Sequence, residues 1–190
     1  MKSQTHYLVL RIFLLALLLI ITASACQGIQ SRDEHSPYYQ PGPGSLLILN
    51  TAVEIPPNQA SIYLQYGKVV REKDIQVREA NCKFEVRDVL PVAQTIQNDT
   101  FVIQRVQLQN QFVAYDRVIV ASAMEAQFGS PVAEVYTTTY YLKSEKQPQV
   151  LYLTCQHWEV VGDGNHLSIE EIRQALGVMM TLDVKAAKTQ

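Results

Sequence analysis

Hydrophobic and polar residues alternate with a period of two over most of the chain between Ser45 and Val161, which is the pattern of half-buried β-strands. Val, Thr and Tyr, which suit a pleated surface, are frequent in these segments, and Pro, Gly, Asn or Asp separate them. Seven or eight strands are predicted, in the ranges 45–53, 60–66 with 68–70, 76–89, 101–109, 111–121, 132–142 and 150–161. This spacing predicts a mainly β domain, either an antiparallel sandwich or a barrel-like sheet.

The period changes near the C-terminus, after a turn rich in Gly and Asp. Ser168 and Glu171 occupy the two positions of a helix capping box. Apolar residues then recur at helical spacing, so the pattern predicts one C-terminal amphipathic helix over about 169–181 that packs on the sheet. Gly177 is a position at which this helix could end early. The last residues, 183–190, are predicted to form a solvated tail.

The N-terminus follows a third pattern. Two basic residues, Lys2 and Arg11, precede an apolar run at 12–21, and small residues then lead to Cys26. The run has about ten residues, which is short of the roughly 20 that a membrane-spanning helix needs. This layout predicts a bacterial secretion signal over residues 1–25. An ordinary secretory signal and an uncleaved N-terminal anchor are the alternatives that the same residues allow.

The residues around Cys26 favour a lipoprotein among these alternatives. Ala23-Ser24-Ala25-Cys26 resembles the lipobox that lipoprotein signal peptidase cuts, although Ala23 stands where Leu is usual. Several acyl chains on Cys26, at about 0.8 kcal/mol per CH₂, would anchor the protein permanently. Gln27 follows the cysteine in place of Asp, which by resemblance to enterobacterial sorting rules implies the outer membrane, facing the periplasm. The polar, Pro- and Gly-rich stretch 26–44 is predicted to be the lipidated cysteine and a flexible tether.

One β-rich globular domain with its helix is predicted at 45–182, a length sufficient for a single core. Removal of the signal would leave 14 basic and 18 acidic residues, a net charge of −4. This balance argues against nucleic acid as a partner.

The two remaining cysteines are predicted to form a disulfide, as an even pair does in an oxidising compartment. Cys82 lies in phase with Phe84 and Val86, and Cys155 lies in phase with Leu153, so both side chains face inward from their strands. They can meet across the core or between neighbouring strands. Closing the loop between them would stabilise the fold by about 4 kcal/mol on the chain-entropy model.

The sequence contains no nucleophile motif and no phosphate-binding glycine loop, so no catalytic residue is predicted. The histidines of the mature chain, His35, His157 and His166, match no metal-ligand spacing. Asp163-Gly164-Asn165 with Glu170 resembles half of a calcium loop, but the early ligands are wrong or missing. We therefore expect neither a cofactor nor a metal, and no enzyme.

Aromatic residues on the predicted strands are the candidate interaction surface, because Tyr and Trp are enriched at protein interfaces. Each of them is equally ordinary in a half-buried sheet. The candidates are Tyr136, Tyr140, Tyr141 and Trp158.

The domain as a whole resembles a family of small gammaproteobacterial envelope lipoproteins. The motifs that carry the resemblance are Pro43-Gly44-Ser45-Leu46, Ile55-Pro56-Pro57-Asn58-Gln59-Ala60, Asn81-Cys82-Lys83-Phe84-Glu85, Leu153-Thr154-Cys155 and Leu167-Ser168-Ile169-Glu170-Glu171-Ile172. The resemblance implies no activity. The sequence thus predicts a non-enzymatic outer-membrane lipoprotein, a structural or adaptor component of an envelope assembly such as a secretion or other trans-envelope machine, with envelope proteins as partners. The alternative is a carrier that holds a lipid or small apolar ligand inside the β-domain.

Overall fold

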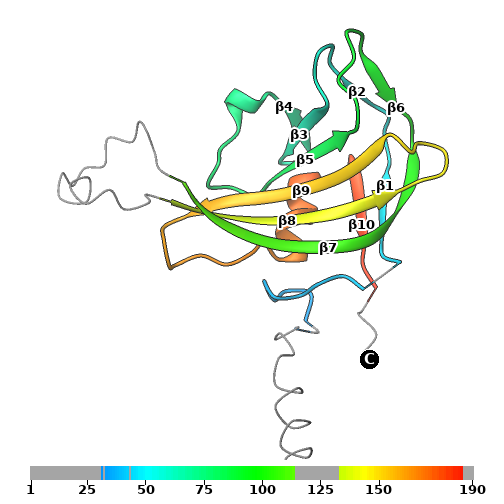
Figure 1. Ribbon diagram of the computed structural model, residues 1–190. Helices are drawn as coiled ribbons and strands as arrows, with labels where there is room; N and C mark the ends of the chain where they lie inside the picture. Colours follow the sequence, from blue (N-terminus) through cyan, green and yellow to red (C-terminus); the bar gives the residue numbers. More distant parts are fainter. Residues whose placement is uncertain (1–30, 32, 43, 114–132, 186–190) are drawn as a thin grey trace, which may run out of the picture. The chain divides into compact units, whose positions relative to one another are not determined.

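The sheet that dominates the fold has eight strands, each antiparallel to its neighbours, in the order β10-β1-β7-β8-β9-β5-β3-β4 (Figure 1). A computed structural model of the chain describes residues 31, 33–42, 44–113 and 133–185, which belong to one folded unit. The strands are β1 (Leu46–Leu49), β2 (Val53–Ile55), β3 (Ser61–Gln65), β4 (Lys68–Val70), β5 (Asn81–Val86), β6 (Gln94–Ile96), β7 (Asp99–Val113), β8 (Ala133–Lys143), β9 (Val150–Glu159) and β10 (Met180–Asp183). The short strands β2 and β6 form a separate two-stranded sheet.

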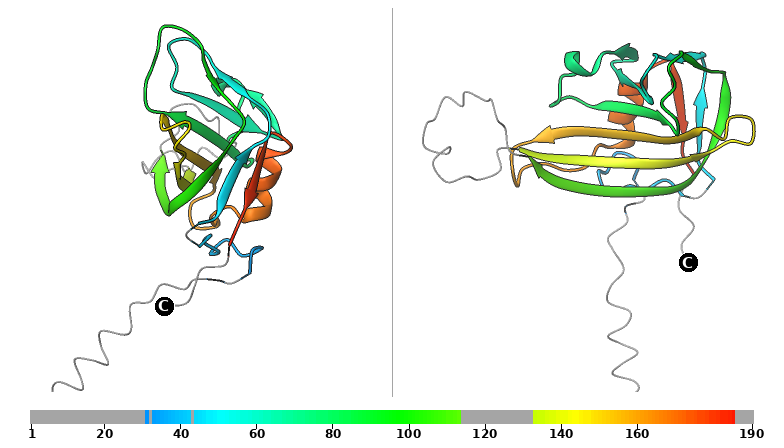
Figure 2. Two further views of the ribbon diagram at one scale, coloured as in Figure 1. Left: turned by 90° about the vertical axis from the view of Figure 1, so that its right-hand side faces the viewer. Right: turned by 45° about the horizontal axis from the view of Figure 1, so that its top comes forward.

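The eight strands curl into a half-barrel with a concave and a convex face (Figure 2). The start of β7 pairs with β1, and most of its length pairs with β8. Its register shifts between Ile103 and Arg105, where Gln104 is the extra residue of a bulge. A bulge bends its strand, so β7 leads from the β1–β10 end of the sheet into a long ribbon made of β7, β8 and β9. The prediction of a mainly β antiparallel domain is confirmed, and the sheet takes a barrel-like form.

The core lies on the concave face. Phe84, Phe101, Tyr140 and Leu153 are almost completely buried, and the rings of Phe84 and Phe101 meet edge to face at 5.9 Å. The helix α2 (Ile169–Leu176) packs its apolar side into the same core. The buried helix residues are Ile169, Ile172, Ala175 and Leu176. In the described part of the chain, side chains fill the concave side of the sheet.

Helix α2 closes the gap between the two ends of the sheet, since it contacts β10 at one edge and β3 and β5 near the other. The predicted capping box forms: Glu171 N–H donates to Ser168 Oγ, and Ser168 N–H donates to the Glu171 carboxylate at 2.7 Å. The helix ends at Gly177, whose φ of 54° favours glycine. A Cβ on Gly177 would overlap the backbone of Gly67 in the β3–β4 turn. The closure therefore depends on two glycines in direct contact.

Several predicted elements differ from the structure. The predicted strand at 45–53 is divided between β1 and β2, which belong to different sheets. The helix ends at Leu176 rather than near Thr181, and Met180 instead begins β10, which pairs with β1. The predicted strands at 101–109 and 111–121 are one continuous strand as far as Val113. The rest of the second predicted strand lies outside the described residues.

Cys82 and Cys155 form a disulfide with an S–S distance of 2.10 Å, between neighbouring strands rather than across the core. They stand directly opposite each other on β5 and β9, with their Cα atoms 4.0 Å apart. Both side chains are buried on the concave face, as their phase along the strands predicts. The bond joins two strands near the middle of the sheet.

Residues 33–42 lie within the predicted tether, but the structure packs them against the domain. Tyr39 is buried with the core, and Gly42 N–H donates to Lys185 O at 2.7 Å. Glu34 forms an ion pair with Arg173 of α2 at 3.0 Å. Ordered contacts thus begin before Ser45.

Candidate functional site

The candidate aromatic residues do not share one surface, because successive residues of a strand point to opposite faces of a sheet. Tyr140 is 1% exposed in the core, and Tyr136 is 8% exposed on the same concave face. Burial raises the pKa of Tyr140. The prediction that these two tyrosines belong to a contact surface is therefore wrong. Tyr141 and Trp158 are half-buried on the convex face.

The convex face carries two neighbouring rows of side chains that cross five strands, in the order β3-β5-β9-β8-β7. We call them the outer rows. The strand register places the members of each row directly opposite one another. The first row is Ser61, Glu85, Tyr152, Tyr141 and Arg105; the second is Tyr63, Lys83, Thr154, Thr139 and Gln107.

Tyr141 is the centre of the first outer row. The guanidinium carbon of Arg105 lies 3.7 Å from the centre of the Tyr141 ring, which is a cation–π contact. The rings of Tyr141 and Tyr152 meet edge to face at 5.0 Å. The Tyr141 hydroxyl donates to Gln107 Oε1 at 2.8 Å, which joins the two rows. These contacts hold the aromatic side chains in fixed orientations on the convex surface.

The β5 end of the outer rows is charged and adjoins a hollow. Lys83 Nζ lies 2.8 Å from the Glu85 carboxylate and 6.0 Å from the centre of the Tyr63 ring. The hollow has a volume of about 410 Å³ and is lined by Tyr63 and Lys83 together with residues of β4 and the turn that follows it. Burial and a hydrogen bond to Glu72 raise the pKa of Tyr63 to about 12. The rows therefore combine amphipathic rings, paired charges and a concavity.

A second polar cluster lies on the concave face at the far end of the ribbon. Glu134, 5% exposed, accepts hydrogen bonds from Asn110 Nδ2 at 2.5 Å and from the Tyr136 hydroxyl at 2.8 Å. The segment 160–167 folds over this end, and Gly162 N–H also donates to the Glu134 carboxylate, at 3.4 Å. Gly164 lies so close to Tyr136 that a Cβ there would overlap the ring.

The electrostatics of this cluster favour an ionised Glu134. Hydrogen bonds from Tyr136 and Asn110 hold the pKa of Glu134 below its usual value, against the effect of burial. The same bond to Glu134, with burial, raises the pKa of Tyr136 to about 12. Burial and the nearby His157 lower the pKa of His166. The hydrogen bond from Gly162 N–H and the edge-to-face contact of the His166 ring with Tyr136 fasten the segment 160–167 to the ribbon. The three donors leave the Glu134 carboxylate poorly placed to act as a base.

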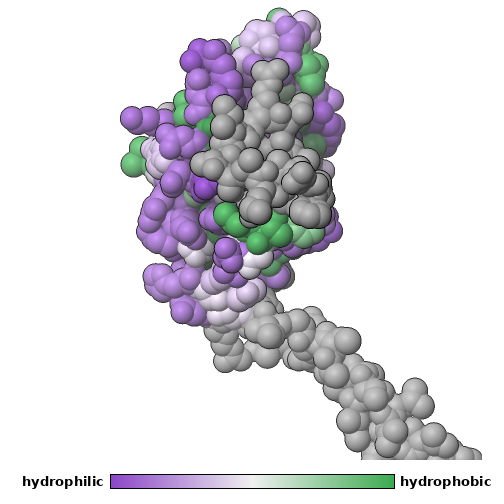
Figure 3. All heavy atoms as spheres, turned by 90° about the vertical axis from the view of Figure 1, so that its left-hand side faces the viewer, coloured by the Kyte–Doolittle hydropathy of each residue, from purple (hydrophilic) through white to green (hydrophobic). Residues whose placement is uncertain are grey.

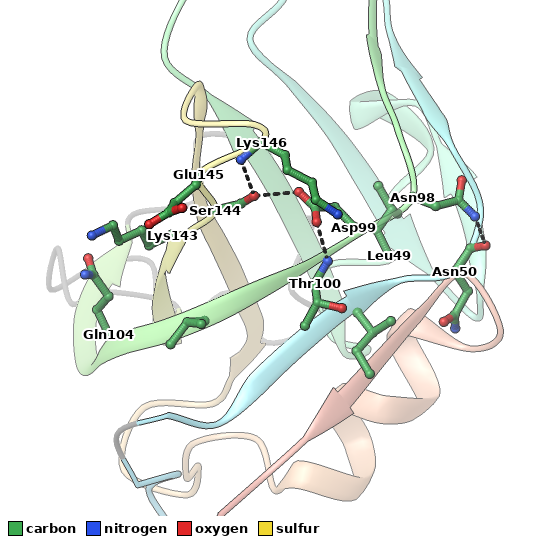
Figure 4. A pocket seen from close by; sticks show the side chains of 12 residues that line it. Leu49, Asn50, Asn98, Asp99, Thr100, Gln104, Lys143, Ser144, Glu145 and Lys146 are labelled. Carbon is green, nitrogen blue, oxygen red and sulfur yellow. Dashed lines mark hydrogen bonds between the residues drawn. The ribbon is translucent and has the colours of Figure 1, made fainter.

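A wider hollow of about 990 Å³ lies between the start of β7 and the β8–β9 turn (Figure 4). Asp99 accepts hydrogen bonds there from Ser144 Oγ, Gln147 Nε2 and its neighbour Thr100 N–H. Burial raises the pKa of Asp99, but these hydrogen bonds outweigh it and lower the pKa. Asp99 therefore anchors the β8–β9 turn to β7.

Apolar residues are exposed at the free end of the ribbon, which Figure 3 shows among more hydrophilic neighbours. Phe112 is 60% exposed near the end of β7, and Val160 and Val161 are exposed just after β9. Register places Phe112 opposite Glu134, so these residues lie near the concave polar cluster.

Neither polar arrangement is visible as a pattern in the sequence. The members of the outer rows come from five strands, and only the register brings them together. The sequence did contain a sign that the predicted tyrosines do not share one face, because the period of two separates Tyr136 and Tyr140 from Tyr141.

Comparison of the chain with family models, with curated proteins and with solved structures gave no match. Within the described ranges, no group of His, Cys, Asp or Glu residues has the arrangement of a metal site. Among those residues, no helix is long and apolar enough to cross a bilayer.

Proposed function

We propose that this protein is a lipid-anchored component of the bacterial cell envelope that binds a protein partner through the outer rows. The observation that carries the proposal is the ordered chain of contacts from Arg105 through Tyr141 to Tyr152. Aromatic and Arg side chains dominate the binding energy of protein interfaces. Side chains already held in place lose less conformational entropy on binding.

The charge of the outer rows supports a protein partner rather than nucleic acid. The rows contain two cations, Lys83 and Arg105, and one anion, Glu85. Lys83 is already paired with Glu85. A nucleic-acid surface would instead present a continuous excess of cations. The mixture of rings, amides and hydroxyls is that of a specific polar interface.

The anchor rests on the N-terminal pattern that ends at Cys26. Its test is metabolic labelling with palmitate in a Gram-negative host: the parent chain is expected to take up label, and Cys26→Ala is expected to take up none. Release of the unlabelled parent into the soluble periplasm would favour an ordinary secretory signal instead.

The interface is tested by a photo-crosslinking residue placed at Tyr152 in cells. The matched control is the same residue at Val178, which is 85% exposed and follows α2, away from the outer rows. A discrete adduct is expected from position 152 and none from position 178. Tyr141→Ala in the 152 chain is expected to reduce that adduct without loss of folded protein. Equal adducts from both positions, or none from position 152, would refute this interface.

A further inference from the structure

Within the described ranges, the edge of β7 away from β8 has no partner strand over most of its length. β1 pairs with Asp99–Val102, and the backbone of Ile103 still bonds with Ser45 and Gly44. Beyond this point, in the part of the chain that the structure describes, β7 pairs only with β8. Among the described strands, residues 104–113 therefore form a free edge on the side away from β8.

The direction of the backbone groups along this edge follows from the register. Ile103 points its N–H and C=O toward β1, and Gln104 is the bulge residue. Backbone direction alternates along a strand, so the outward residues after the bulge are the even-numbered ones. The cysteine pair gives the same result independently. The short Cα separation of Cys82 and Cys155 is that of a non-hydrogen-bonded pair. Hydrogen-bonded and non-hydrogen-bonded pairs alternate from strand to strand across β9 and β8, so the backbone N–H and C=O of Leu108 point outward. The outward residues are Val106, Leu108, Asn110 and Phe112.

The other edges of the sheet are protected, whereas this one is not. β4 has three residues and begins with Lys68. β10 has four residues, and Arg173 Nε donates to Leu182 O within it. Natural sheets protect edges by short length, charge or proline. Between Gln104 and Val113 the only charged residue is Arg105, next to the bulge, and there is no proline.

We propose that the open edge of β7 pairs with the same edge of a second copy of this chain, antiparallel about a twofold axis at Gln109. This register pairs Val106 with Phe112 and Leu108 with Asn110, so all four outward residues of each copy are used. About eight backbone hydrogen bonds result, two for each outward pair.

The side chains of the edge fit a second copy. On the concave side, the register brings Phe112, 60% exposed in one copy, against Val106 of the other. On the convex side, Gln107 faces Gln111, and such amides pair without a charge. Arg105 of each copy lies opposite Val113, so the two cations stay at opposite ends of the pairing. A twofold contact of this kind closes on itself and gives a dimer rather than a filament.

The test is cysteine crosslinking of the full-length chain in its native membrane, followed on non-reducing gels. Gln109 would face Gln109 of the second copy as a non-hydrogen-bonded pair, with Cα atoms about 4.5 Å apart. That separation suits a disulfide. Gln109→Cys is therefore expected to give a covalent dimer above the level of the parent chain, with about twice the protein mass.

The matched control is Gln107→Cys, on the same strand and the same face. In this register the two copies of residue 107 are four residues apart, roughly 14 Å, which is too far to bond. Equal crosslinking of both variants, or no dimer from Gln109→Cys, would overturn the proposal. So would an adduct of Gln109→Cys with a different protein, since the edge would then belong to another partner.

A second measurement removes the pairing without a cysteine. Leu108→Pro eliminates an outward N–H that no described strand uses, which edge strands tolerate. In detergent solution the parent chain is expected to sediment as a dimer, and Leu108→Pro at half that protein mass, with circular dichroism unchanged. A monomeric parent at every concentration would refute the pairing.

Discussion

The concave face of the β7–β8–β9 ribbon has two halves that are covered in different ways. In the near half, register aligns Val106, Tyr140 and Leu153, and the apolar side of α2 lies in the same core. In the far half it aligns Asn110, Tyr136 and His157, beside the segment 160–167. The row between them contains the disulfide. The same sheet therefore binds α2 through buried apolar area and the segment 160–167 through hydrogen bonds.

The difference shows which half of the face fixes the position of the segment packed on it more narrowly. Apolar burial is large in total but does not depend on direction, so it tolerates small shifts of the helix. Hydrogen bonds fall off steeply when their geometry is lost. Gly162 N–H and the Tyr136 hydroxyl both require the Glu134 carboxylate in one position. The far half therefore fixes the path of 160–167 more narrowly, with less buried area.

The largest expected effect is in the core beside the near half, where Phe84 of β5 lies opposite Leu153 of β9. Phe84→Ala removes a fully buried ring and leaves a cavity between the sheet and its core neighbours, at a cost of about 3–5 kcal/mol in the free energy of unfolding. Urea unfolding of the purified chain measures it. Val178→Ala, at an exposed position, is the control and is expected to have little effect. If Phe84→Ala lowered the free energy of unfolding by less than variants of the far half do, apolar burial would not be the stronger of the two contributions.

A smaller effect, with a distinct pH dependence, is expected from Glu134→Gln in the far half. The folded pKa of Glu134 lies below its ordinary value of 4.5, so its contribution to stability is present above that pH and is lost as the pH falls through the folded pKa. Tyr136 has its pKa raised to about 12, so its contribution is lost as the pH rises from 10 toward 12. Glu134→Gln is expected to weaken both of these dependences.

Urea midpoints from acid to alkaline pH measure this change. Glu170→Gln is the matched control, because it removes an exposed carboxylate from the first turn of α2 without contact with the Glu134 network. Identical pH profiles for Glu134→Gln and the parent chain would show that the network does not contribute to the stability of the far half.

The smallest effect is expected where the two covers meet, at the start of α2. Ser168→Ala removes the hydroxyl that accepts from Glu171 N–H and should cost about 1 kcal/mol. Ser168→Thr keeps a capping hydroxyl and is expected to restore most of the stability. Urea unfolding of the three chains measures the difference. An equal loss in both variants would mean that the site responds to side-chain size rather than to capping.

The sequence predicts the near half better than the far half for a physical reason. Because alternate residues are buried, the sequences of strands such as β3, β5 and β9 show a hydrophobic period of two. The inward positions of Cys82 and Cys155 follow the same pattern. The far half places Asn110, Tyr136 and His157 at inward positions, so its polar residues look like surface residues in the sequence. Only tertiary contacts distinguish them.

Two other features were out of reach for different reasons. Met179 and Met180 continue the helical spacing of α2, so the sequence does not show that the chain leaves Gly177, with its positive φ, to form β10. The outer rows depend on the register of five strands. A single sequence fixes the face of each residue but not its neighbour across the strands.

The position of the disulfide has a consequence for a chain that is held at a membrane by its N-terminus, as we propose. Tension on such an anchor would first load the contacts that residues 33–42 make with the domain. It would then load β1, which is joined to its neighbours over only four residues. The covalent link between β5 and β9 spans a sequence separation of 73 residues, so roughly 250 Å of contour length cannot be drawn out by that tension. Loading would peel away the β1–β10 end while the segment bearing Arg105 and Tyr141 stayed inside the closed loop. The part of the outer rows that includes Arg105 and Tyr141 would thus stay folded under tension longer than the strand nearest the anchor.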